Sequence, residues 1–128
     1  MDIINIVILS LSGLLLTFVG SMRLFNPIQT YAKNSGIELP NEVNLLNEMR
    51  GVSGVMLSGG LLAFLGIFLP ELTRSSFVVL CVIYLGFAIG RTLSFNLDGK
   101  ANQQIVSGLV FELVLGGANL FGLIRSLG

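Results

Sequence analysis

Glu112 is the one acidic residue in the apolar stretch VSGLVFELVLGG. An ionised carboxylate in hydrocarbon is costly unless a cation, water or a proton compensates its charge. Arg91 lies seven residues before Asp98 in the preceding apolar stretch, and Glu112 lies twelve residues after Lys100. If the two stretches are antiparallel helices joined by a tight turn, their depths differ by about 6 Å, which a guanidinium side chain can cross. The spacing therefore predicts an ion pair between Arg91 and Glu112.

Further polar residues fall near the same ends of the apolar stretches. Ser94 and Asp98 follow Arg91 on one helical face, and Tyr84 lies two turns before it. Arg50 enters from the apolar stretch before that one. We therefore expect one half of the membrane to hold a charged cluster. The candidate binding residues are Glu48, Arg50, Tyr84, Arg91, Ser94, Asp98, Glu112 and Asn119.

Two interpretations of this cluster stay open at the level of sequence. In the first, Arg91 and Glu112 form a structural ion pair that sets helix register, while Arg50 and Asp98 cap helix ends and reach the headgroups. In the second, the charges line a polar pocket that opens toward the loops. There the arginines hold an anionic group or lipid headgroup, and Glu112 binds a cation or a proton.

The composition limits the classes of function. Of 128 residues, 53% are hydrophobic and 11% are charged, and the mean hydropathy of +0.88 is typical of a membrane protein. Seven basic and seven acidic residues leave no net charge and no basic run, which argues against nucleic acid as a partner. The chain has no histidine and a single cysteine, Cys81, inside an apolar run. We therefore predict no metal site, no cofactor and no catalytic triad.

Four apolar runs are long enough to cross about 30 Å of hydrocarbon, which takes roughly 20 helical residues. A transmembrane barrel would need at least eight shorter alternating segments, so helices are favoured. We predict an all-α integral membrane four-helix bundle that forms a single domain over residues 1–128. The expected helices are residues 3–22, 47–69, 72–97 and 103–125.

The connections between these helices differ in length. Residues 23–47 form a long polar connection that contains two prolines, and we expect it to include a short amphipathic helix through Val43, Leu46 and Met49 on the membrane surface. The second connection is a few residues long, and the third contains an Asp-Gly turn. Both short connections predict antiparallel hairpins.

Small and polar residues recur at helical spacing in all four runs. Helices in lipid associate through close backbone approach and interhelical hydrogen bonds, so such residues are expected at helix contacts. The predicted contact faces are Ser10, Gly13, Thr17 and Gly20; Asn47, Gly51, Gly54 and Ser58; Gly86 and Gly90; and Gln104, Gly108, Glu112, Gly116 and Asn119.

Two segments, NEMRGVSGVML and GRTLSFNLDG, followed by an acidic residue inside the last helix, carry a resemblance. From about Gly13 to its end, the chain resembles the bacterial four-helix family called domain of unknown function 4345. That family is similar to the wider DoxX-like group, which includes subunits associated with quinone-linked oxidoreductases and animal assembly factors for ligand-gated channels. The resemblance implies a multi-pass protein of the bacterial inner membrane. Its motif positions here are Glu48, Arg50, Arg91, Ser94, Asp98 and Glu112.

Three functions are compatible with these features. The one we favour is a binding or assembly protein, whose charged half recognises a lipid, a small amphiphile or another membrane protein. The second is a small transporter coupled to protons or cations, which would need to act as a homodimer or larger oligomer because four helices are few. The third is an accessory subunit of a quinone-linked enzyme, which ranks last because the sequence shows no ligand for haem, flavin or metal.

Overall fold

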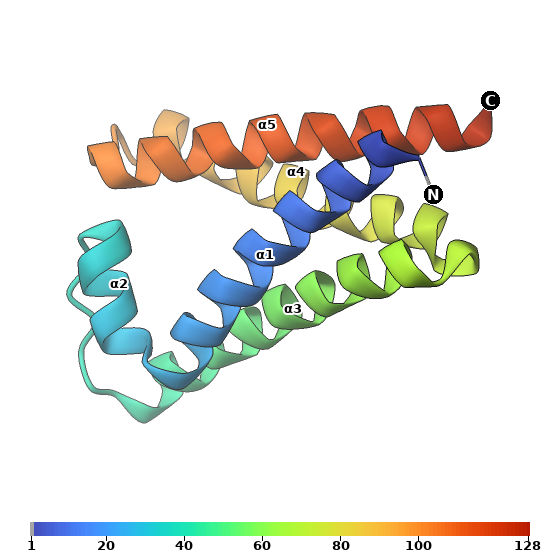
Figure 1. Ribbon diagram of the computed structural model, residues 1–128. Helices are drawn as coiled ribbons and strands as arrows, with labels where there is room; N and C mark the ends of the chain where they lie inside the picture. Colours follow the sequence, from blue (N-terminus) through green and yellow to red (C-terminus); the bar gives the residue numbers. More distant parts are fainter. Residues whose placement is uncertain (1) are drawn as a thin grey trace.

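The computed structural model describes residues 2–128, and every regular element in this range is a helix (Figure 1). In chain order the elements are α1 (Ile3–Phe25), α2 (Pro27–Ser35), α3 (Val43–Phe68), η1 (Pro70–Leu72), α4 (Thr73–Leu97) and α5 (Gln103–Leu127). The four long helices have 23 to 26 residues each and are apolar enough to cross a membrane. The predicted all-α membrane bundle is confirmed, and the protein is a multi-pass integral membrane protein.

Polar residues cap the starts of three long helices. The carboxylate of Asp2 accepts a hydrogen bond from the backbone N–H of Ile4 (2.8 Å), and that of Glu42 accepts one from Leu45 (2.8 Å). Asn102 starts α5 in the same way. Such caps satisfy the N–H groups that a helix leaves free at its first turn. The cap at Glu42 explains why α3 begins at Val43, four residues earlier than the apolar run alone predicts.

The long connection differs from the prediction in where its short helix lies. Residues 43–49 are the first turns of α3, and the separate short helix is α2. Pro27 occupies the first turn of α2, where its missing N–H costs nothing. Gly36 ends the helix with a φ of 66°, a conformation that favours glycine. These two residues define a helix that the amphipathic pattern at Val43 does not indicate.

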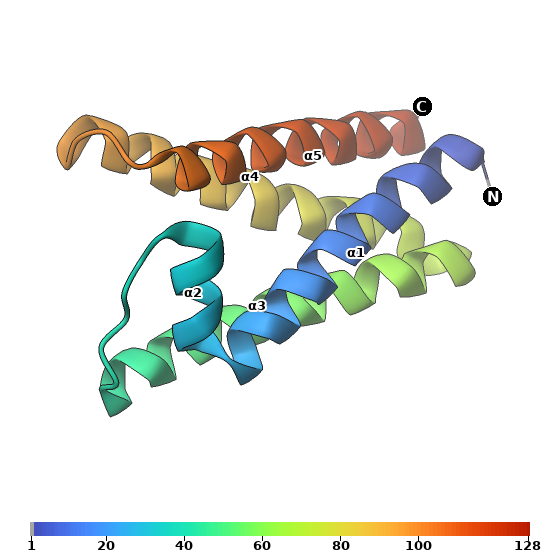
Figure 2. The ribbon, with the colours of Figure 1, turned by 60° about the vertical axis from the view of Figure 1, so that its left-hand side comes forward.

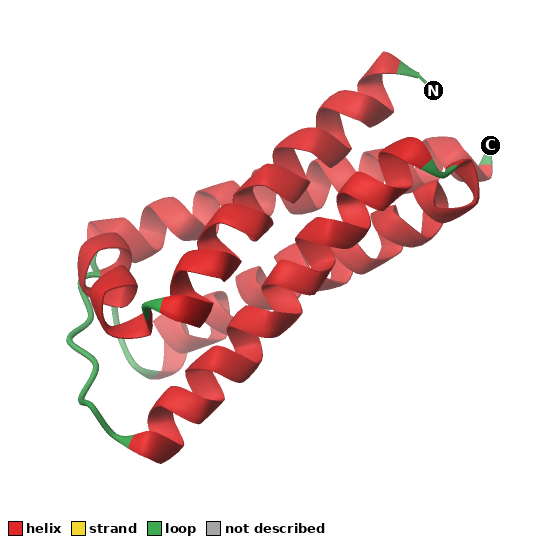
Figure 3. Ribbon diagram, turned by 60° about the horizontal axis from the view of Figure 1, so that its bottom comes forward, coloured by secondary structure: helices red, strands yellow, loops and turns green. Residues whose placement is uncertain are grey.

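The helices form an open arrangement at the loop end. The pairs α3–α4 and α4–α5 are antiparallel hairpins, and α1 packs along α3 (Figure 3). In Figures 1 and 2, α1 and α5 lie close together near the two termini and diverge toward the opposite end. There α2 lies between the end of α1 and the start of α5. This divergence creates the space in which the candidate site lies.

The contact between α1 and α3 follows the predicted face of α1. Gly13 and Gly20 are buried, and a Cβ atom at Gly13 would lie 3.1 Å from the Cβ of Ala63. At Gly20 a Cβ would lie 2.8 Å from the backbone N of Leu57. Close backbone approach through small residues is the main source of helix association in lipid.

The predicted contact faces of α3 and α4 are wrong. Nothing lies within 4 Å of the Cβ positions of Gly51, Gly54, Gly86 and Gly90, and Ser58 is exposed. The buried face of α3 contains Ser53, Met56, Gly59, Gly60, Ala63 and Gly66. Small residues occupy two faces of α3, and only one of them matches the glycines of α1.

On the α4–α5 contact, large side chains of α4 fill the spaces above glycines of α5. Phe77 lies against Gly122, and Leu85 lies against Gly116. The glycines of α4 therefore face outward, whereas the polar face predicted for α5 does point inward. Gly116 and Asn119 on that face are buried.

The terminal end of the bundle holds an ion pair between Asp2 and Arg125. The hydrogen bond from the backbone N–H of Ile4, together with the Arg125 side chain, lowers the pKa of Asp2 below its ordinary value. Because the folded pKa is the lower one, the pair stabilises the fold at neutral pH. Its contribution is lost as the pH falls from about 4 through the folded pKa.

We therefore expect acid to destabilise the wild-type protein more than Asp2→Asn. Thermal unfolding in detergent, compared between about pH 7 and pH 3, measures this difference. Lys100→Gln, which alters an exposed cation at the other end of the bundle, serves as a control. Parallel pH profiles for wild type and Asp2→Asn would contradict the role given to Asp2.

Candidate functional site

The site begins with the ion pair between α4 and α5. Nε of Arg91 donates a hydrogen bond to Oε1 of Glu112 at 2.8 Å, which confirms the predicted pairing. The two side chains are 25% and 12% exposed. The guanidinium of Arg91 also lies over the ring of Phe87, 5.9 Å from its centroid. The pair thus connects the two helices in a largely protected position.

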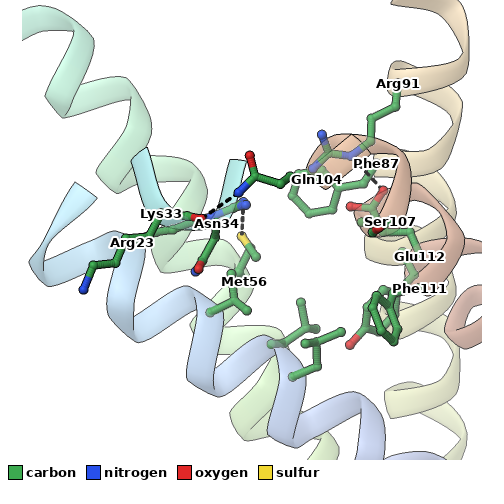
Figure 4. Close-up of a pocket in the computed structure, with 15 residues that line it drawn as sticks. Arg23, Lys33, Asn34, Met56, Phe87, Arg91, Gln104, Ser107, Phe111 and Glu112 are labelled. Atoms are coloured by element: carbon green, nitrogen blue, oxygen red, sulfur yellow. Dashed lines mark hydrogen bonds and ion pairs between the residues drawn. The ribbon is translucent and has the colours of Figure 1, made fainter. Parts of the chain in front are cut away.

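A cavity of about 420 Å³ lies beside this pair (Figure 4). This volume is in the range of small-molecule sites in proteins. Its apolar wall consists of Leu15, Leu16, Val19, Met56, Phe87 and Phe111. Its polar lining consists of Arg23, Lys33, Asn34, Tyr84, Arg91, Gln104, Ser107 and Glu112. The combination of an apolar wall and a few convergent polar groups suits an amphiphilic ligand.

A second guanidinium, that of Arg23 at the end of α1, lies across the cavity from Arg91 (Figure 4). Its terminal nitrogens make two long hydrogen bonds, to Sδ of Met56 (3.9 Å) and to Oγ of Ser35 (3.4 Å). The guanidinium carbon lies 4.5 Å from the centroid of the Tyr31 ring. The Nε atom is buried and has no hydrogen-bond partner in the part of the chain that the structure describes.

The charges around the cavity do not cancel. Within residues 2–128, the ion pairs are Arg91–Glu112 and Asp2–Arg125, so no carboxylate pairs with Arg23. Three cationic residues, Arg23, Lys33 and Arg91, therefore line the cavity against the single carboxylate of Glu112, which pairs with Arg91. Electrostatic interactions are stronger at a protected site than in water, so this excess positive charge favours an anionic occupant.

Helix α2 covers the cavity at the loop end. Nε2 of Gln104 donates a hydrogen bond to the carbonyl oxygen of Lys33 (2.8 Å), and Nδ2 of Asn102 donates one to that of Ser35 (2.8 Å). Oγ1 of Thr30 donates to the carbonyl oxygen of Met22 (3.0 Å). These bonds connect α2 to the start of α5 and to the end of α1.

Beneath the cavity, a buried polar network joins three helices. The hydroxyl of Tyr84 donates to the carbonyl oxygen of Ser12 (2.7 Å). Nδ2 of Asn119 donates to Oγ of Ser12 and to the carbonyl oxygen of Leu115, both at 2.8 Å. Tyr84 lines the cavity, whereas Asn119 lies deeper, in the core. The amide nitrogen of Asn119 is satisfied by these bonds, whereas its Oδ1 is buried and has no hydrogen-bond partner within the described residues.

Besides Asn119, four of the predicted site residues do not line the cavity. Ser94 and Asp98 are exposed and bond to each other, with Oγ of Ser94 donating to Oδ2 of Asp98 (2.8 Å). Arg50 is exposed and donates to the carbonyl oxygen of Leu24, and Glu48 is exposed. The face of α3 that packs on α1 turns Arg50 away from α4 and α5, so the predicted single cluster is split.

Comparison with known protein families gives one match. The family described as Domain of unknown function (DUF4345) matches residues 4–123. The chain belongs to this family. No curated protein and no solved structure matches the chain. The DUF4345 match supplies no activity for the cavity, and the membrane fold is shown by the four long apolar helices.

In this DUF4345 protein, Arg23 is a cavity-lining cation that is not among the candidate site residues predicted from the sequence. The buried positions Leu9, Leu16 and Gly20 follow one face of α1, and Arg23 continues that face by one step of three residues. The signal was present in the periodicity. Arg23 stands at the end of the apolar run, where a cation ordinarily reaches the headgroups, so the sequence by itself does not assign its side chain to the interior of the bundle.

Proposed function

We propose that the protein binds an anionic amphiphile inside the membrane, with the acidic group of the ligand between Arg23 and Arg91. The observation that carries this proposal is the unneutralised guanidinium of Arg23, with a buried and unpartnered Nε, beside a cavity of about 420 Å³. A charged group without an anionic partner is expensive inside a membrane protein and is a marker of function. A phosphate or carboxylate in the cavity would supply the negative charge that Arg23 lacks.

The ion pair has a supporting role in this proposal. Glu112 holds Nε of Arg91 and so orients the guanidinium at the wall of the cavity. Because arginine carries five N–H donors, the bond to Glu112 leaves donors for a ligand. The structural and the binding interpretations of the pair are therefore compatible.

The resemblance of NEMRGVSGVML and GRTLSFNLDG to bacterial four-helix proteins supports two finer assignments. We place the protein in the bacterial inner membrane and in the DoxX-like group of small four-helix membrane proteins. The inner membrane is rich in anionic amphiphiles of the kind that the cavity would bind.

The proposal is tested by measuring how well the Arg23→Gln variant retains an anionic lipid. Native mass spectrometry of the purified protein with phosphatidylglycerol should show binding weakened about 10-fold to 100-fold, the effect of losing one charge-assisted contact. The matched control is Arg50→Gln, which changes an exposed arginine outside the cavity and should bind as the wild type does. Equal retention by wild type and both variants would reject the proposal.

A second variant separates binding from architecture. In Arg91→Leu with Glu112→Leu, an ion pair is replaced by apolar residues, which is often neutral or stabilising for the fold. We expect a stable protein that retains less phosphatidylglycerol. Unchanged retention would show that Arg91 takes no part in binding.

A further inference from the structure

An apolar groove adjoins the cavity on the outside of the bundle. It lies between α1 and α5, has a volume of about 570 Å³ and is lined by Leu11, Leu14, Leu15, Phe18, Phe111, Val114 and Leu115. Leu15 and Phe111 line both the groove and the charged cavity. The two spaces therefore adjoin at these two residues, with charge on one side and an apolar lining on the other.

The direction of the groove matches the orientation of a membrane lipid. Along α1 the groove spans Leu11 to Phe18, and along α5 it spans Phe111 to Leu115, so its whole α1 wall lies farther from the loop end than Arg23. Arg23 lies on the other side of Leu15, near the loop end of α1. A lipid of the leaflet on the loop side has its headgroup and its chains in this same order.

The groove also opens toward the bilayer. Leu14, Phe18 and Val114 are 58%, 65% and 61% exposed, and α1 and α5 diverge on this side of the bundle (Figure 2). On the loop side, the hydrogen bonds from Gln104 and Asn102 to the end of α2 cover the cavity. The lateral side, which these hydrogen bonds do not close, is thus the route we assign to a molecule with a long apolar part.

We infer that the ligand is an anionic lipid whose acyl chain lies in the groove between α1 and α5, and that it enters from the bilayer. This inference depends on the proposed function, because the headgroup site is the cavity between Arg23 and Arg91. The chain gains little free energy from the groove, since the surrounding lipid is equally apolar. The role of the groove is geometric, because it gives the chain of a bound headgroup a path out of the bundle.

The first experiment blocks the groove and leaves the charges in place. Leu14→Trp puts a larger side chain into the groove, and Leu61→Trp makes the same change at an exposed leucine of α3 outside every cavity described here. Native mass spectrometry with dioleoyl phosphatidylglycerol should show about a tenfold loss for Leu14→Trp, from steric exclusion, and no loss for Leu61→Trp. If Leu14→Trp retained the lipid fully, the proposed position of the acyl chain would be wrong. If only Arg23→Gln lost the lipid, the headgroup site would still be supported.

The second experiment distinguishes a lipid from a free phosphate ester. Glycerophosphoglycerol carries the same headgroup without chains, and dioleoyl phosphatidylcholine carries the same chains without net charge. Neither should displace bound dioleoyl phosphatidylglycerol. Displacement by glycerophosphoglycerol would overturn entry from the bilayer, and displacement by phosphatidylcholine would overturn recognition of the negative charge.

The third experiment locates the chain. A phosphatidylglycerol with a photoreactive diazirine in one acyl chain should label α1 and α5 more strongly than the phosphatidylcholine analogue does. A second apolar groove, which includes Val55 and Val82 on α3 and α4, has no connection to the charged cavity and is the internal control. Labelling there should be equal for the two probes. Equal labelling at both grooves would overturn the inference.

Discussion

Glu112→Ala should lower the free energy of unfolding in detergent by about 3 kcal/mol. The substitution leaves the guanidinium of Arg91, only 25% exposed, without its carboxylate. Breaking a buried pair from one side costs about 3–5 kcal/mol, whereas an exposed pair contributes about 0–1 kcal/mol. Because both side chains have low exposure, we expect a cost at the lower end of the range for buried pairs. Unfolding by sodium dodecyl sulfate, followed by circular dichroism, measures the loss.

Two further variants test the explanation. Glu48→Ala removes an exposed carboxylate from α3 and should change the stability by less than about 0.5 kcal/mol. The charge swap Arg91→Glu with Glu112→Arg should recover part of the loss, because it restores an ion pair between the same helices. If the double variant were less stable than Arg91→Glu alone and Glu112→Arg alone, the two residues would not form a direct structural pair.

The second large effect is expected at Gly20, where α1 meets α3. Gly20→Ala places a Cβ atom 2.8 Å from the backbone N of Leu57 and 3.2 Å from its Cα. A backbone cannot move aside as a flexible side chain can, so the two helices must separate. Overpacking of a tight contact costs about 1–3 kcal/mol. The thermal unfolding temperature in detergent should fall accordingly.

The matched control for this prediction is Gly86→Ala on α4. Nothing lies within 4 Å of the Cβ position of Gly86. Alanine is favoured over glycine in a helix by about 1 kcal/mol, so Gly86→Ala should be neutral or stabilising. Gly20→Ala is thus expected to lower the stability of the fold, whereas Gly86→Ala should leave it unchanged or raise it. Destabilisation by Gly86→Ala would instead indicate that the outward face of α4 contacts a partner.

The α1–α3 contact also matters for the candidate site. Gly13 and Gly20 allow α1 to pack closely on α3, and Met56 of α3 contacts Arg23 at the end of α1. Because α1 follows α3, it diverges from α5 toward the loop end, where the cavity opens (Figure 1). Loosening this contact should therefore affect ligand retention as well as stability.

Much of the architecture could be predicted from composition and spacing. Four apolar runs of sufficient length predicted four spanning helices, because the bilayer tolerates few other structures. The pair between Arg91 and Glu112 was predicted because a tight hairpin leaves little freedom in the relative depth of its two helices. Depth along a helix follows from counting residues. The inward face of α5 could be predicted for a different reason, because its polar residues form a single stripe.

Rotation of a helix about its axis could not be predicted in the same way. α3 has small residues on two faces, at Gly51 and Gly54 and at Gly60 and Ala63, and the sequence pattern does not distinguish them. In lipid there is no hydrophobic force to orient a uniformly apolar helix, so the fit to the neighbouring backbone selects the face. That choice turns Arg50 outward. The same packing of α1 on α3 brings Arg23 to the cavity. This second arginine could therefore be placed at the site only from the tertiary structure, because it lies outside the two sequence segments that carry the motif.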